Sequence, residues 1–164
     1  MIKIMLDSNV YDEVIAVSGF ADRLRAAIET GHIDIVTTPI QRDELGRIPD
    51  PAKRAATLDV PGTVISTAGA VWGVSRFDQA RYGKGDGDIV YTDIFKGNPR
   101  DIEDALIAIT AASEADVLVT QEKGKLPKRI LAARSKLTVW DFAQLRRYID
   151  DIDPRSAPSV GSSV

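Results

Sequence analysis

The stretch His32-Ile-Asp-Ile-Val-Thr-Thr-Pro-Ile-Gln41 decides the fold, because a strand and the start of a helix lie next to each other in it. Residues 32–37 alternate between apolar and polar side chains, which is typical of a β-strand. Thr38 then occupies the N-cap of a helix, Pro39 its first position and Gln41 its third, where Gln41 completes a capping box. A strand that passes directly into a helix is the repeating step of an α/β fold.

The same alternation recurs on both sides of this stretch. Residues 2–6 are apolar apart from Lys3 and stop at Asp7-Ser8-Asn9, which predicts a buried first strand. Further strands are expected at 117–120 and 137–140, and helices at 10–17, 21–30 (ended by Gly31), 99–115, 128–134 and 141–149. This order predicts a mostly parallel sheet with helices on both faces.

The length of 164 residues fits one domain, which we expect at residues 1–150. Residues 151–164 have the composition of a flexible C-terminal tail. Residues 46–99 give a weaker pattern, in which 64–67 is compatible with a strand and 76–90 with a loop over a site.

The composition limits the chemistry that the chain can perform. Cysteine is absent and His32 is the single histidine, so a metal would be held mainly by oxygen atoms, which suits Mg²⁺ or Mn²⁺. The net charge of −3 neither favours nor excludes binding to nucleic acid. No apolar run is long enough for a membrane helix or a signal peptide, so we expect a cytoplasmic protein.

Asp104 occupies an unusual position for a carboxylate. At 100° per residue it falls outside the polar side of its helix and among small residues, so we expect it to point into the interior or a cleft. The polar side comprises Glu103, Thr110, Ser113 and Glu114, and the small residues are Ala108, Ala111 and Ala115. The alternative is that Asp104 only helps to start the helix.

Glu44 is similar, because it falls angularly between Ile40 and Ile48 on the apolar stripe of its helix. The alternative is a Glu that reaches solvent or pairs with Arg47. Asp7 ends the first strand at the carboxyl edge, where open α/β sheets bind ligands, although it could equally cap the next helix.

Glu122 comes two residues after Thr120, again at a carboxyl edge, and could also be an ordinary exposed charge. If three or four such carboxylates converge, their mutual repulsion requires a divalent cation. Such a cation can activate water and stabilise charge on a phosphoryl oxygen, so the set is suited to phosphodiester hydrolysis. The sequence contains neither GxxxxGK[ST] nor GxGxxG, which argues against P-loop and dinucleotide chemistry.

The ordered motifs resemble those of PIN domains, the ribonuclease fold of VapC-type toxins. They are Leu6-Asp7-Ser8-Asn9-Val10, Arg42-Asp43-Glu44-Leu45, Glu103-Asp104-Ala-Leu-Ile-Ala-Ile-Thr-Ala111 and Val117-Leu-Val-Thr120-Gln-Glu122. The resemblance implies a three-layer α/β/α sandwich, an Mg²⁺ or Mn²⁺ site and endonucleolytic cleavage of RNA. It implies metal-binding and catalytic roles for Asp7, Glu44 and Asp104, and site-ordering roles for Asn9 and Thr120.

Glu122 stands where the family usually has Asp, so its role as a fourth metal ligand rests on a longer side chain. The basic residues beyond it, Lys123, Lys125, Lys128 and Arg129, could hold a phosphate backbone, although a charge run is more often a solvated face. The resemblance also implies RNA as substrate, an antitoxin protein as partner and a homodimer as assembly.

Two other functions remain open. One is a degenerate PIN fold that binds RNA or protein without cleaving. The other is a phosphatase of the haloacid dehalogenase class, which also begins with a strand and an Asp; that class needs a second Asp where this chain has Asn9.

Overall fold

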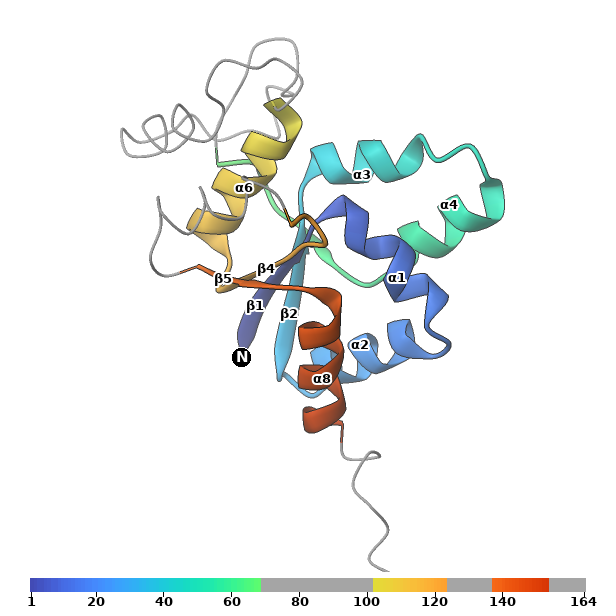
Figure 1. Cartoon of the computed structure of the whole chain (residues 1–164), viewed down its shortest axis with the longest axis vertical. Helices are drawn as coiled ribbons and strands as arrows, with labels where there is room; N and C mark the ends of the chain where they lie inside the picture. Colours follow the sequence, from blue (N-terminus) through green and yellow to red (C-terminus); the bar gives the residue numbers. More distant parts are fainter. Residues whose placement is uncertain (69–101, 124–136, 154–164) are drawn as a thin grey trace, which may run out of the picture.

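The computed structural model describes residues 1–68, 102–123 and 137–153, and Figure 1 shows their arrangement. Three of the expected segments lie outside these ranges: the helix at 128–134, the loop at 76–90 and residues 154–164 of the tail. The described elements are β1 (Ile2–Leu6), a 3-10 helix η1 (Ser8–Val10), α1 (Tyr11–Ala16), α2 (Phe20–Glu29), β2 (Ile33–Thr37), α3 (Pro39–Gly46), α4 (Pro51–Leu58), β3 (Thr63–Val64), α6 (Ile102–Glu114), β4 (Val117–Val119), β5 (Thr138–Trp140) and α8 (Phe142–Ile152).

The five described strands form one sheet in the order β3-β2-β1-β4-β5, and every neighbouring pair is parallel. Ile4 is in register with Ile35 of β2 on one side and with Val117 of β4 on the other. After β1 the chain therefore adds β2 and β3 on one side of this strand, and it then crosses over to add β4 and β5 on the other side. The carboxyl ends of β1 and β4 meet at this reversal, which is where open α/β sheets bind ligands.

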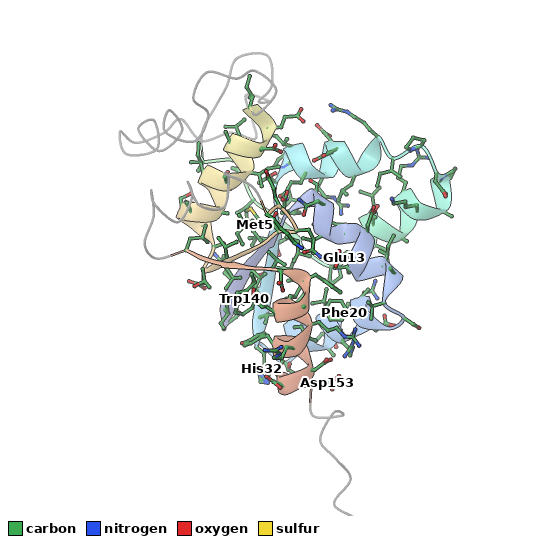
Figure 2. All side chains as sticks on the ribbon, in the orientation of Figure 1. Met5, Glu13, Phe20, His32, Trp140 and Asp153 are labelled. Carbon is green, nitrogen blue, oxygen red and sulfur yellow. The ribbon has the colours of Figure 1, made fainter. Side chains whose placement is uncertain are left out.

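Helices cover both faces of the sheet, as the sequence predicted. Because successive strand residues point to opposite faces, Ile4 and Leu6 belong to one core cluster and Met5 to another. The first cluster includes buried residues of α1, α2 and α8, and within it Phe20, labelled in Figure 2, packs edge-on against Phe142 with ring centroids 5.2 Å apart. The second cluster contains residues of α6. The molecule is thus a three-layer α/β/α sandwich (Figure 1).

The predicted starts of α3 and α8 are confirmed by their capping bonds. Thr38 and Gln41 form the expected capping box, and Asp141 forms a second one with Gln144. Gly31 follows α2 with a φ of +73°, a left-handed conformation that favours glycine.

Three expectations need correction. α8 continues to Ile152, because Ile152 packs against the first core cluster, so residues 151 and 152 are helical and not part of the tail. β3 spans Thr63–Val64 and not the expected 64–67. Thr110, expected on the polar side of its helix, is fully buried; its hydroxyl donates to the Leu106 carbonyl on the same helix and accepts from the Ala68 backbone N–H. No helix in the described ranges has the length and apolar character needed to cross a membrane.

Candidate functional site

Asp7 lies where the sheet order reverses. It directly follows β1, and its backbone N–H donates to the carbonyl of Val119 at the end of β4, at 2.8 Å. Asp7 therefore sits between the carboxyl ends of the two strands that flank the reversal, as expected for a ligand-binding position.

Both carboxylate oxygens of Asp7 accept hydrogen bonds. Oδ1 accepts from the backbone N–H of Ser8 at 2.8 Å, which is the helix-capping contact that the alternative interpretation predicted. Oδ2 accepts from the hydroxyl of Thr120 at 2.7 Å and from the side-chain amide of Asn9 at 2.8 Å. Capping accounts for the first oxygen only, whereas the second is held by residues of η1 and of the strand end at β4.

The environment of Asp7 acts on its ionisation. Burial is the largest effect and raises the pKa of its carboxyl above the usual range, because a charge is poorly solvated there. The bonds from Thr120, Ser8 and Asn9 lower this pKa, while the nearby negative charge of Glu44 raises it. Burial prevails, so the charged form of Asp7 lacks sufficient compensation from the residues around it.

The hydroxyl group of Ser8 links Glu44 to Asp7. The Ser8 hydroxyl donates to Glu44 Oε2 at 2.5 Å, while the Ser8 backbone N–H binds Asp7. Ser8 therefore connects the two carboxylates, a role that sequence reasoning missed. The adjacency of Ser8 to Asp7 was the available signal.

Glu44 is exposed, so the expectation that it faces the interior was wrong. The buried stripe of its helix contains the expected Ile40 and Leu45, together with Gln41. Glu44 lies beside that stripe at the carboxyl edge of the sheet.

Gln41 was recognised as a capping residue, but its second role was missed. Its side chain is fully buried, and its amide donates to the Leu6 carbonyl, one residue before Asp7, at 2.5 Å. Its oxygen accepts from the Thr38 backbone N–H at 3.0 Å. Gln41, Leu45 and Ile48 have helical i, i+4, i+7 spacing, so the buried position could have been found from the sequence.

Asn9 and Thr120 also order the chain that follows β4. The Asn9 side-chain oxygen accepts from the Gln121 backbone N–H at 3.0 Å, and the Thr120 hydroxyl accepts from the Glu122 backbone N–H at 3.1 Å. The two side chains thus contact Asp7 and fix the backbone beside it. The role in ordering a metal site that the PIN resemblance implied for them stays a prediction.

Asp104 does not point into the protein interior as expected, whereas Glu122 has the exposed position that its alternative interpretation described. Both residues are exposed. The first turn of α6 carries Asp104, while the buried run of this helix begins at Ala105. α6 precedes the parallel strand β4, so its amino end faces the carboxyl edge of the sheet, and α6 also contacts α3.

The donor set of the site suits a hard cation only in part. Asp7 and Glu44 provide carboxylate oxygens, which Mg²⁺ and Mn²⁺ prefer, and a cation would offset both the burial of Asp7 and the charge of Glu44. Among residues 1–68, 102–123 and 137–153 no group of three or more acidic or histidine side chains is arranged to hold a metal.

The predicted basic residues lie largely outside the described part of the chain. Lys123 is described and exposed, next to Glu122. Lys125, Lys128 and Arg129 fall outside the described residues. His32 is exposed at the opposite edge of the sheet, where its carbonyl accepts from the Ile2 backbone N–H.

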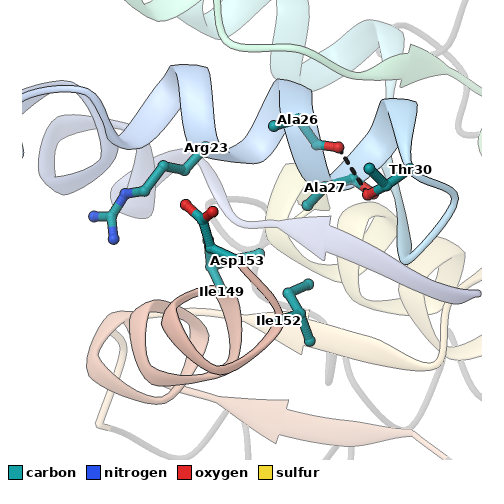
Figure 3. Close-up of a pocket in the computed structure, with 7 residues that line it drawn as sticks. All are labelled: Arg23, Ala26, Ala27, Thr30, Ile149, Ile152 and Asp153. Atoms are coloured by element: carbon teal, nitrogen blue, oxygen red, sulfur yellow. Dashed lines mark hydrogen bonds between the residues drawn. The ribbon is translucent and has the colours of Figure 1, made fainter. Parts of the chain in front are cut away.

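A pocket of about 90 Å³ lies between α2 and α8, away from Asp7 (Figure 3). Its lining is mostly apolar and comes from α2, the end of α8 and the residues that directly follow them. The lining residues are Arg23, Ala26, Ala27, Thr30, Ile149, Ile152 and Asp153. Arg23, one of the polar lining residues, forms an ion pair with Asp150.

Comparison with known proteins finds a likeness among solved structures. No protein-family model matches the chain, and no curated protein matches it. Among solved structures, a chain of the VapBC2 complex from Rickettsia felis, crystallised bound to a DNA fragment from their promoter, is similar in fold with a TM-score of 0.50. The sequence identity is 16%, and the match covers 85% of this chain and 98% of that chain. The likeness supports the α/β/α architecture and is consistent with the PIN-like fold that the motifs predicted.

Proposed function

We propose that this chain is a metal-dependent endoribonuclease of the PIN-domain kind, which hydrolyses RNA phosphodiester bonds at the edge of the sheet where Asp7 lies. The observation that carries the proposal is Asp7 itself. It is a carboxylate with a raised pKa at the reversal of the sheet, held by Thr120 and Asn9 and linked through Ser8 to Glu44. Capping the three-residue helix η1 requires only a side-chain acceptor at its N-cap and none of these additional contacts.

Asp7 and Glu44 would hold an Mg²⁺ or Mn²⁺ ion, and Asp104 and Glu122 complete the proposed set of ligands. When bound, the ion supplies an activated water and stabilises charge on the phosphoryl oxygen. Thr120 and Asn9 orient Asp7 through its Oδ2, and Ser8 orients Glu44. Lys123, with Lys125, Lys128 and Arg129, would contact the phosphate backbone beside the acidic site.

The proposal extends to a role as the toxin of a toxin–antitoxin pair. The similar chain comes from a VapBC2 complex, which is a statement about that protein. The sandwich architecture and the Asp7 site support carrying the role over to this chain, with an antitoxin protein and a second copy of the chain as proposed partners.

The test is cleavage of single-stranded RNA by the purified chain with Mn²⁺ and with EDTA. We expect Mn²⁺-dependent cleavage that Asp7→Asn abolishes, because the substitution removes a negative charge at the centre of the site and changes little else in size. Asp116→Asn is a matched control, since Asp116 directly precedes β4 and its carboxylate accepts from the Lys3 backbone N–H at the amino end of β1, away from Asp7. Equal cleavage by wild type and Asp7→Asn would contradict the proposal.

A second candidate function is a PIN-like fold that binds RNA or a protein without cleaving. It is favoured by the exposure of Asp104 and Glu122 and by the lack of a three-carboxylate group among the described residues. Intact RNA together with retained RNA binding in the same assay would support it. Release of phosphate from a small monoester would instead support the phosphatase, although Asn9 here donates its amide to Asp7 and provides no second carboxylate.

A further inference from the structure

Beneath the two linked carboxylates lies a buried polar cluster that the proposed reaction does not use. It consists of Thr37 at the end of β2, Thr38 at the N-cap of α3, and Gln41, and all three are buried. Gln41 is the centre: its oxygen is within hydrogen-bonding reach of the Thr38 N–H at 3.0 Å, the Thr38 hydroxyl at 3.2 Å and the Thr37 hydroxyl at 3.4 Å. Its amide donates to the Leu6 carbonyl.

These bonds join two elements that are distant in sequence. The capping box holds Gln41 to the start of its own helix, as in many helices. The bond to the Leu6 carbonyl is different, because it ties α3 to the last residue of β1 across 35 positions of the chain. A capping residue does not need this bond, so the Gln41 amide has a tertiary role.

The geometry gives that tertiary role a consequence at the site. Gln41 and Glu44 are three residues apart on α3, close to one turn, so they move together with the helix. Leu6 directly precedes Asp7. Fixing Gln41 against Leu6 therefore fixes the part of α3 that carries Glu44 against the strand end that carries Asp7. The Ser8–Glu44 bond at 2.5 Å depends on this spacing.

We infer that Gln41 is a positioning residue, whose bond to the Leu6 carbonyl sets the separation of the Asp7 and Glu44 carboxylates. The inference rests on the proposed function where it concerns a metal, but the spacing itself can be measured without one. Gln41 acts through Leu6 and Glu44, and it touches neither a substrate nor an ion.

The first test measures the spacing in the metal-free protein. The interaction between Asp7→Asn and Glu44→Gln is obtained from a double-mutant cycle in urea unfolding with EDTA at one neutral pH. The cycle is then repeated in the Gln41→Met background, which keeps the size of the side chain and removes its hydrogen bonds. We expect the interaction between the two carboxylates to be largely lost in Gln41→Met, because α3 is no longer tied to Leu6.

The control for a general loss of stability is Thr57→Val. Thr57 is also fully buried, and its hydroxyl donates to a carbonyl within α4. We expect this variant to be destabilised while its Asp7–Glu44 interaction stays as in wild type. If Gln41→Met does not fold, Gln41→Asn replaces it, because the shorter amide cannot span from Thr38 to Leu6.

The second test measures Mn²⁺ binding by calorimetry. We expect binding to weaken by about 10- to 100-fold in the Gln41 variant, the usual loss when a residue that supports a metal ligand is changed, and to be unchanged in Thr57→Val. A wild type that binds no Mn²⁺ would overturn the proposed metal-dependent function. An Asp7–Glu44 interaction that is the same with and without Gln41 would overturn the positioning role, whatever the result with Mn²⁺.

Discussion

The hydroxyl of Thr120 offers the sharpest test of how the site is built. It is 6% exposed, donates to Asp7 Oδ2 at 2.7 Å and accepts from the Glu122 backbone N–H at 3.1 Å. Thr120→Val keeps the shape and removes both bonds. A hydrogen bond to a charged group contributes about 1.5–3 kcal/mol and a neutral one about 0.5–1.5 kcal/mol, so we expect a loss of about 2–4 kcal/mol at neutral pH.

The loss should depend on pH, and its direction follows from the Asp7 carboxyl. Its pKa is raised in the folded state, so its contribution to stability is complete below the unfolded pKa of about 3.9 and is lost as the pH rises through the folded pKa. The Thr120 bond lowers that folded pKa, and Thr120→Val therefore raises it further. The destabilisation by Thr120→Val should be smallest in acid and grow towards neutral pH.

The assay is urea unfolding with EDTA, followed by tryptophan fluorescence, at about pH 4 and about pH 7. Thr138→Val on β5 is the control, because Thr138 is an exposed threonine in the same sheet and its substitution should change stability by no more than about 0.5 kcal/mol. An equal effect of Thr120→Val at both pH values, or a neutral-pH effect as small as that of the control, would refute the reasoning.

Three further predictions address the ion, the charge pair and the fold. Mn²⁺ should raise the melting temperature of wild type, with a stabilisation of about 2.7 kcal/mol at 100 times the dissociation constant, and Asp7→Asn should abolish the shift in thermal unfolding; an unchanged wild-type curve at millimolar Mn²⁺ would count against the metal site. Glu44→Gln should lower the pKa of the Asp7 carboxyl, since the Glu44 charge raises it, and an NMR titration of that carboxyl without metal would show a rise or no change if the two groups are not near neighbours. Gly31→Ala should destabilise the protein by about 1 kcal/mol, because φ is +73° there, and an unchanged urea midpoint would show that the turn relaxes.

The layers of the fold were predictable because their signals are local. The capping box at Thr38 and Gln41 and the apolar run of β1 each follow from a few neighbouring residues, and the structure contains both. The strand order was not predictable in the same way. It depends on which strands pair across long sequence separations, such as Ile4 with Val117, and no local pattern specifies that pairing.

The exposure of the candidate carboxylates was harder to predict for a physical reason. Helix periodicity gives the direction in which a side chain points around the helix axis. It does not give how far along the helix the packing against the sheet extends. Asp104 lies in the first turn of α6, and the buried residues of this helix begin at Ala105. The face of α6 that carries Asp104 is therefore exposed at Asp104 and buried from the next turn onward. Glu44 is open to solvent in the same way, at the edge of the sheet.

The two interpretations of Asp7, helix cap and site residue, are therefore compatible, and the energetics separate them. An N-cap contributes about 1 kcal/mol, and Asn or Ser provides it without a charge. A carboxylate whose pKa burial raises works against folding at neutral pH, so capping alone would favour Asn at this position. Thr120, Asn9 and Ser8 reduce that cost without removing it. A carboxylate that opposes stability at the reversal of a parallel sheet is expected of a cation-binding site, because a bound cation would supply the missing compensation.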